Sequence, residues 1–258
     1  MSELFSIQLQ NRQQQGGDGV WLDLPTTTEQ VQVALRQIGI SSDNPQGLFI
    51  SGYFAEEEKR FAISYNMVLA SNVDELNFLA SRLETLSTGE RAELNAALQA
   101  PQSELFSIGR ITDFPENVDY YVHLPDVHGP AQLGDYYLNR SGMVNMPEEW
   151  KGGIDTAQFG RYVAQQEQGA FTQYGYLVKS GDEWQKVHEG QPVPEEYRVL
   201  SFPAPEVLRD SANIPPPVQP ETEPQKVIPI ILNGKDSAER MKEITDRLET
   251  GIQQLFDS

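Results

Sequence analysis

Three histidines and many carboxylates are the side chains of this sequence that could support metal binding or acid–base chemistry. His123 and His128 stand five residues apart, on either side of Pro125. A metal site would need both rings to converge with a carboxylate such as Asp126. Five residues interrupted by a proline place the two rings on no common helix face. We therefore interpret His123 as a strand residue and His128 as a turn residue, and we expect no metal.

Other arrangements that commonly carry catalysis or cofactors are missing from the sequence. It contains no cysteine, which excludes a thiol nucleophile, cysteine-bound zinc and a disulfide scaffold. It contains no glycine-rich phosphate loop, nucleophile elbow, zinc-protease helix or calcium loop. Acidic residues are so frequent that some will meet by chance, so their proximity does not diagnose acid–base catalysis. We expect neither an enzyme nor a bound cofactor.

Acidity is the most informative bulk property of the chain. The formal net charge is −19, and residues 1–200 contain 28 acidic against 13 basic residues, so the excess is not confined to a tail. Such a surface repels nucleic acids and anionic membranes, and it attracts proteins that bind polyanions. Many cytosolic proteins are acidic only for solubility, so charge alone does not choose between these explanations.

No feature of the sequence indicates export or a membrane span. No stretch of about 18 apolar residues occurs, and the N-terminus lacks the basic and apolar segments of a signal peptide. The absence of cysteine fits a reducing compartment. We therefore expect a cytoplasmic protein.

Residues 1–70 have the pattern of a small α+β module. A helix is expected to begin at one of the threonines 26–28, with Glu29 in its first turn, and to end at Gly39. Apolar alternation or an apolar run predicts three strands, at residues 4–10, 20–24 and 47–54.

Residues 71–102 are predicted to form an acidic helical hairpin. Asn72 is a suitable cap for the first helix, whose leucines recur at spacings of three and four residues. The sequence 87–90 breaks this helix and begins a second one that runs to Pro101.

Residues 103–202 are predicted to form a second α+β module. Short helices are expected at 103–111 and 131–138, and a longer helix is expected to begin at Asp155. Strands are expected at 120–124, 170–178, 184–187 and 197–200.

The composition then changes. Residues 203–226 form a proline-rich linker, and residues 227–258 are predicted to form a short strand and an amphipathic helix. The fold class expected from the sequence is therefore α+β, as an elongated chain of three small modules followed by the linker and a terminal helix.

Three segments of the sequence resemble a known family when taken in order. Residues 21–25, Trp-Leu-Asp-Leu-Pro, lead into Thr-Thr-x-Glu and a helix that closes with Ile-Gly at 38–39. Residues 73–80 have an acidic cap followed by Leu-Asn-Phe-Leu-Ala, and residues 133–138 contain Leu-Gly-x-Tyr-Tyr. This set, over about residues 3–200, resembles the ArdA antirestriction family of mobile genetic elements.

The resemblance implies a function, a partner and an assembly. ArdA proteins are elongated mimics of DNA with three small domains, and they bind type I restriction-modification enzymes and block restriction, often modification too. They dimerise through the C-terminal domain. The resemblance thus implies a non-enzymatic inhibitor that occupies the DNA-binding groove of its target as a homodimer. The linker and terminal helix depart from the family, and their role stays open.

Candidate site residues follow from this interpretation. Carboxylates that would stand where phosphates lie are Asp74, Glu75, Glu84, Glu90, Glu93, Glu104, Asp113, Glu116, Asp119, Asp126 and Asp135. Apolar residues that would form the dimer interface are Met143, Val144, Met146 and Tyr176.

Two other functions remain open at this point. One is an acidic scaffold or adaptor whose partner does not bind nucleic acid, which the proline-rich linker and terminal helix would suit as docking devices. The other is an enzyme, such as a hydrolase, that uses a carboxylate cluster the sequence does not locate. An enzyme predicts a deep pocket with carboxylates of raised pKa, and an adaptor predicts no competition with DNA.

Overall fold

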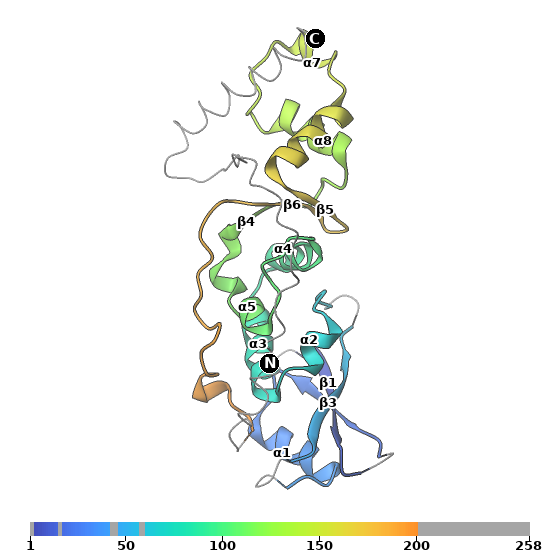
Figure 1. Cartoon of the computed structure of the whole chain (residues 1–258), viewed down its shortest axis with the longest axis vertical. Helices are drawn as coiled ribbons and strands as arrows, with labels where there is room; N and C mark the ends of the chain where they lie inside the picture. The colour runs from blue at the N-terminus through green and yellow to red at the C-terminus, as the bar shows by residue number, and fades with distance from the viewer. Residues whose placement is uncertain (1–2, 15–16, 42–45, 57–59, 201–258) are drawn as a thin grey trace, which may run out of the picture. The chain divides into compact units, whose positions relative to one another are not determined.

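The computed structural model describes residues 3–14, 17–41, 46–56 and 60–200, and it confirms a mixed α+β fold. The described chain divides into two compact units, coloured by residue number in Figure 1. Unit 1 contains residues 3–91, 104–116 and 185–200, and unit 2 contains 92–103 and 117–184. The three successive modules of the sequence analysis are a different partition and stay a prediction. The predicted linker and terminal helix lie outside the described residues.

Unit 1 is built on a three-stranded antiparallel sheet. Its strands are β1 (Phe5–Asn11), β2 (Val20–Leu24) and β3 (Leu48–Phe54), in the order β2-β1-β3. Ile7 of β1 lies opposite Leu22 and Tyr53. Alternate residues of β1 are buried, as the period of two requires. All three strands predicted for this region are confirmed.

Helices pack against the strands of this sheet. Helix α1 (Thr28–Gln37) packs on β2, and the short α2 (Tyr65–Leu69) packs on β3. Thr27 caps α1 in a capping box with Gln30, and Gly39 follows with a φ of +68°. The predicted start and end of this helix are therefore confirmed.

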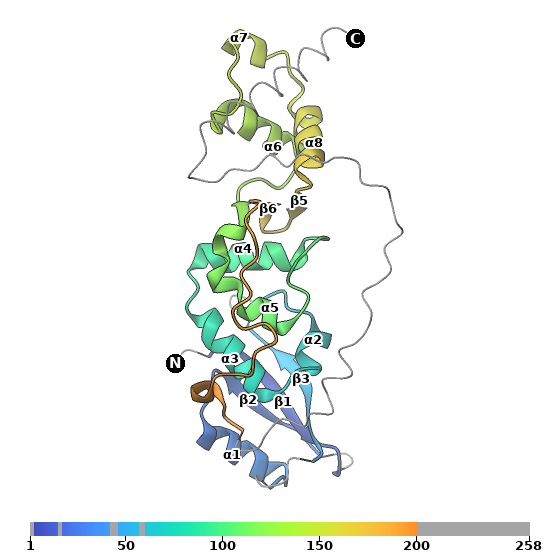
Figure 2. The same ribbon diagram turned by 60° about the vertical axis from the view of Figure 1, so that its left-hand side comes forward.

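Helix α3 (Val73–Glu84) is the central helix of unit 1. It begins with the predicted cap, Asn72, and it packs on β2 and on α5 (Ile108–Thr112), which lies beside it in Figure 2. Eight of its residues are buried, so its apolar surface covers more than one face and needs several partners. Those partners include the sheet and α5, and Arg91 of the next helix, α4 (Thr88–Gln99), donates to the carbonyl oxygens of Leu83 and Leu86.

Residues 185–200, which we call the return segment, close unit 1 against α3. Asn77 of α3 donates to the carbonyl oxygen of Tyr197 at 2.9 Å and accepts from the backbone N–H of Thr26 at 2.7 Å. The segment contains the 3-10 helix η5 (Glu195–Tyr197). The strands predicted at 184–187 and 197–200 are wrong.

Unit 2 contains a second three-stranded antiparallel sheet. Its strands are β4 (Tyr121–Leu124), β5 (Ala170–Thr172) and β6 (Gly175–Lys179), in the order β4-β6-β5. The single strand predicted over 170–178 is therefore a hairpin. Gly175 turns it with a φ of +122°, which only glycine adopts readily. Because β6 already has a partner on each side, no edge of it was left for a strand at 184–187.

The remaining helices of unit 2 pack around one core. Helix α6 (Pro130–Asp135) continues into the π-helical turn η4 (Tyr136–Arg140) and crosses α8 (Thr156–Glu167), which Asp155 caps as predicted. The short elements are α7 (Glu148–Lys151) and η3 (Val118–Tyr120), and η2 (Phe114–Glu116) belongs to unit 1. Within the described ranges, no helix combines the length and hydrophobicity that crossing a bilayer requires.

Candidate functional site

Two of the candidate carboxylates are buried inside unit 1. Asp74 is 8 % exposed, and its Oδ1 accepts hydrogen bonds from the N–H groups of Val199 at 2.7 Å and Leu200 at 2.8 Å. Burial raises the pKa of Asp74, while these two hydrogen bonds oppose the rise. Asp113 is fully buried. Neither carboxylate is on the surface, so both are corrected from mimics of phosphate to anchors of the return segment.

Two further candidates have local roles at helix starts but remain accessible. Glu75 and Glu90 are the third residues of α3 and α4, where each accepts a hydrogen bond from the backbone N–H of its cap, Asn72 or Ser87. Hydrogen bonds from Ser87 lower the pKa of Glu90. Capping uses only part of a carboxylate's four lone-pair positions, so both can still meet a partner.

Three candidates take part in ion pairs. Arg82 pairs with Glu116, Arg110 with Glu104 at 2.8 Å, and Arg140 with Asp135 at 2.8 Å. A phosphate mimic paired with an internal cation offers less charge to a partner. These three are therefore weaker candidates than unpaired acids.

Asp119 and Asp126 are exposed and are the best placed of the original set. Glu84 and Glu93 are partly buried. Exposed acids that the sequence interpretation did not select include Glu149, Glu183, Glu195 and Glu196. Each belongs to a pair of adjacent acidic residues, and that pairing was the signal in the sequence that could have found them.

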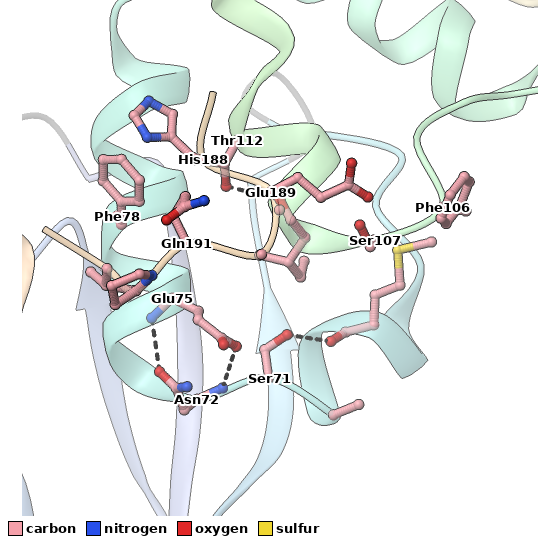
Figure 3. A pocket seen from close by; sticks show the side chains of 17 residues that line it. Ser71, Asn72, Glu75, Phe78, Phe106, Ser107, Thr112, His188, Glu189 and Gln191 are labelled. Atoms are coloured by element: carbon pink, nitrogen blue, oxygen red, sulfur yellow. Dashed lines mark hydrogen bonds between the residues drawn. The ribbon is translucent and has the colours of Figure 1, made fainter. Parts of the chain in front are cut away.

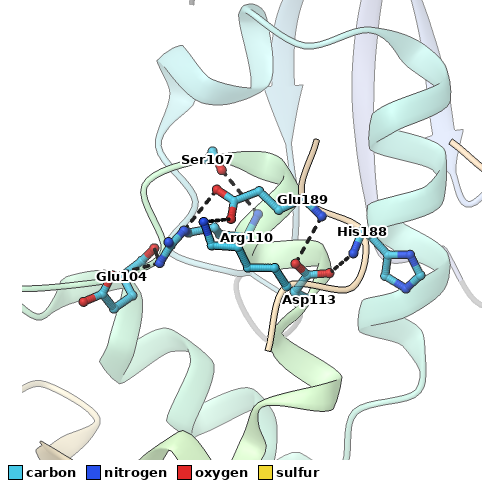
Figure 4. A network of polar contacts seen from close by, with 7 residues as sticks. Glu104, Ser107, Arg110, Asp113, His188 and Glu189 are labelled. Carbon is cyan, nitrogen blue, oxygen red and sulfur yellow. Dashed lines mark hydrogen bonds and ion pairs between the residues drawn. The ribbon is translucent and has the colours of Figure 1, made fainter. Parts of the chain in front are cut away.

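A polar network joins α5 to the return segment, as Figure 4 shows. Arg110 donates to Glu104 and, at 3.1 Å, to Glu189 of the return segment. Asp113 accepts from the backbone N–H of His188 at 2.6 Å and of Glu189 at 3.2 Å. These bonds hold residues 188 and 189 against α5. The other end of the return segment is held by Asp74 and Asn77 of α3.

A pocket of about 590 Å³ lies within unit 1, between the end of α2, the start of α3, the start of α5 and the return segment. Figure 3 shows Phe78 and Glu75 on the α3 side and Phe106 on the other. The ring of Phe106 is 61 % exposed and lies 4.5 Å from the Arg110 guanidinium. The pocket therefore combines aromatic surface with carboxylates.

Among the residues that the structure describes, one side-chain cluster has the composition of a metal site. Ligand atoms of Asp113, Glu116 and His188 lie within 4.8 Å of one another. Asp113 already accepts two backbone N–H groups and Glu116 pairs with Arg82, so both carboxylates have partners without a metal. His123 and His128 are not part of this cluster: His123 lies in β4 as predicted, with its Nε2 2.7 Å from the carbonyl oxygen of Tyr174, and His128 is exposed.

Comparison with known proteins decides the family. A family model described as antirestriction protein (ArdA) matches residues 17–178, which is more than half of the chain. The chain belongs to the ArdA family. The resemblance noted in the sequence is thereby confirmed. No curated protein matches this chain.

The boundaries of the ArdA match divide the candidate site. The match includes α3 and α5 but ends at residue 178, before the return segment. One wall of the pocket, residues 188–193, therefore lies outside the part matched to ArdA. This wall is the portion of the site for which the family comparison gives no information.

The predicted dimer interface of this ArdA chain needs correction. Met143, Val144 and Tyr176 are 3 %, 9 % and 0 % exposed, and all three belong to the core of unit 2. Met146 is partly buried against the same core. Apolar character indicated burial correctly here, but the burial is internal, because these side chains fill the space between α6, α8 and the sheet.

Proposed function

We propose that this ArdA-family chain inhibits a type I restriction-modification enzyme by occupying the groove in which that enzyme binds duplex DNA. It acts without catalysis or cofactor, as a homodimer, in the cytoplasm. The observation that carries the proposal is the ArdA match over residues 17–178 of a chain with a net charge of −19.

The amount of charge suits this role. Duplex DNA carries one charge per about 1.7 Å of axis, so the excess of 15 acidic over basic residues in 1–200 corresponds to about 25 Å of duplex per chain. The proposal needs these charges to be spread along an extended surface. A groove that binds duplex DNA is complementary to the spacing of the phosphate charges as well as to their sign.

The surface of the proposed mimic consists of accessible carboxylates from both units. Its strongest members are Asp119, Asp126, Glu149, Glu183, Glu195 and Glu196, which are exposed. Glu75, Glu84, Glu90 and Glu93 are secondary members, and the ion-paired Glu104, Glu116 and Asp135 contribute less. Lysines and arginines of the target would pair with these groups as they do with phosphates.

A cleavage assay tests the proposal. Purified chain is added to a type I enzyme with a plasmid that carries its recognition site, and duplex DNA without the site is titrated in as competitor. We expect cleavage to be blocked and the block to be relieved by the duplex, because both occupy one groove. A block that no concentration of duplex relieves contradicts DNA mimicry and favours an adaptor that binds elsewhere.

A variant of the inhibitor chain in which exposed carboxylates are neutralised tests whether these carboxylates form the binding surface. A variant with Asp119→Asn, Asp126→Asn, Glu195→Gln and Glu196→Gln changes only exposed side chains that are in no ion pair within the described part of the chain, so we expect it to keep the fold. We expect this variant to need about fourfold or more protein for the same block, because four exposed pairs of about 0.2–1 kcal/mol each sum to at least about 0.8 kcal/mol. An unchanged requirement removes these carboxylates from the proposed surface.

A further inference from the structure

The pocket of unit 1 has features that the summed charge of the surface does not explain. It is lined by residues of four segments, and its volume of about 590 Å³ lies within the range of specific binding sites. Two of its lining residues, Phe78 and Phe106, are aromatic and two, Glu75 and Glu189, are acidic. No lysine or arginine lines it.

Its aromatic residues offer surface for a side chain from outside. Phe78 is 5 % exposed and forms the inner wall, where it contacts the rings of His188 and Tyr197. Phe106 is 61 % exposed at the rim, with Arg110 against its ring. An aromatic ring attracts a cation placed over its face, as the contact between Arg110 and Phe106 already shows here.

Its two carboxylates differ in how much charge they still offer. Glu189 is shared between Arg110 at 3.1 Å and Lys186 at 3.4 Å, which neutralise most of its charge. Glu75 is exposed, and only one of its oxygens accepts a hydrogen bond, from Asn72 N–H at 3.3 Å. Oε2 of Glu189 accepts no hydrogen bond but lies 3.4 Å from Lys186 Nζ, so Glu75 is the carboxylate with more capacity for a new ion pair.

We propose that this pocket receives a basic side chain of the inhibited enzyme, with its charged end at Glu75 and its aliphatic stem along Phe106. The proposal rests on the proposed function, because a protein that binds DNA presents lysines and arginines to its ligand. Arginine suits the site best, since its planar group stacks on an aromatic ring while it bonds a carboxylate. A partner of this kind also fits a lining that contains no lysine or arginine.

The chain provides a matched pair of variants for the test. Glu75 and Glu90 occupy the same third position of a capping box, at the starts of α3 and α4, and only Glu75 lines the pocket. Glutamine serves at this position as glutamate does. Glu75→Gln and Glu90→Gln therefore remove one negative charge each and preserve the helix start.

The first experiment needs no restriction enzyme. N-acetyl-arginine amide is titrated into the ¹⁵N-labelled full chain, and N-acetyl-norleucine amide, which is neutral, is titrated in parallel. We expect the arginine probe to shift the backbone amides of Ser71, Asn72 and Gln191. We expect Glu75→Gln to weaken its binding roughly fivefold, as about 1 kcal/mol for one part-exposed ion pair implies, and Glu90→Gln to leave it unchanged.

Three results would overturn the proposal: equal shifts from the norleucine probe, equal effects of the two variants, or no shift at these amides. A second experiment compares the variants in the cleavage assay, where Glu75→Gln should need more protein than Glu90→Gln. If the unaltered chain fails to block cleavage, the proposed function fails, while the probe titration still shows whether the pocket takes a basic side chain.

Discussion

At the scale of single residues, the least ordinary group is the carboxyl of Glu167 in unit 2. It is 8 % exposed and accepts hydrogen bonds from the hydroxyls of Tyr137 and, at 2.9 Å, Tyr176. Burial raises the pKa of Glu167 to about 7, although both hydrogen bonds oppose the rise. Burial, together with the neighbouring carboxylate, also raises the pKa of both tyrosines.

This raised pKa predicts how stability depends on pH. Between the ordinary value of 4.5 and about 7 the folded chain binds more protons at Glu167 than the unfolded chain does, so its contribution to stability falls as pH rises through this window. The loss is about 3 kcal/mol at about 1.4 kcal/mol per pH unit, and it is complete above the folded pKa. Urea unfolding of the full chain at roughly pH 5 and roughly pH 8 measures this difference in the free energy of unfolding.

Glu167→Gln is the control for this prediction. The amide oxygen can accept from one tyrosine hydroxyl while the amide nitrogen donates to the oxygen of the other, so the contacts persist without a titrating proton. We expect the stability difference between the two pH values to shrink by about the same 3 kcal/mol. If the variant and the original chain show the same dependence, the titrating group is a different one.

Residues whose partners are local were predictable from the sequence. The caps Asn72 and Asp155, and the threonine cap of α1, each bond a backbone N–H two or three residues away. Asp74 and Asp113 instead bond N–H groups 125 and 75 residues away. A pattern of acids on a helix face cannot distinguish such an anchor from a solvated charge, so the sequence placed both among the surface carboxylates.

At the scale of elements, the crossing of α6 and α8 depends on two glycines. A Cβ on Gly160 would lie 1.8 Å from the carbonyl oxygen of Pro130, and one on Gly134 would lie 1.9 Å from that of Thr156. Both obstructing atoms are backbone, so the helices would have to separate. We predict that Gly160→Ala lowers the free energy of unfolding by about 1–3 kcal/mol or more, from overpacking.

Gly89 provides the matched control. It lies in the first turn of α4, and a Cβ there would meet no atom within 4 Å. Alanine costs less conformational entropy than glycine in a helix, so Gly89→Ala should leave stability unchanged or raise it by up to about 1 kcal/mol. Thermal unfolding of the two variants compares them directly, and equal losses at both sites would contradict a tight crossing.

Elements were predictable where their pairing is sequential. The strands and first helix of unit 1 follow one another along the chain, and hydrophobic period, caps and glycine located them. The hairpin of β5 and β6 was read as one strand because aromatic residues, Phe171, Tyr174 and Tyr176, continue across the turn. The strand expected at 197–200 fails because its N–H groups bond the carboxylate of Asp74, and that partner belongs to tertiary structure.

At the scale of the whole molecule, the proposed function requires that charge brings the chain to its target. Acidic residues outnumber basic ones in each unit, so the attraction to a basic groove is the sum of many weak terms. Summed fields act mainly on the rate of association, and salt screens them over about 10 Å at 0.1 M ionic strength. A single exposed acid outside the pocket of unit 1 should therefore matter little to this rate.

The rate of association with the type I enzyme is the quantity that tests this sum. We predict that it falls steeply between roughly 50 and 200 mM salt, while the dissociation rate changes much less. The variant that neutralises Asp119, Asp126, Glu195 and Glu196 should have a lower association rate at low salt. Its association rate should also fall less steeply as the salt concentration rises. Arg161→Gln removes a positive charge from an exposed position of α8, so it must move the rate in the opposite direction. A rate that ignores both variants would mean that contact geometry, and not the field of the acidic surface, brings the two proteins together.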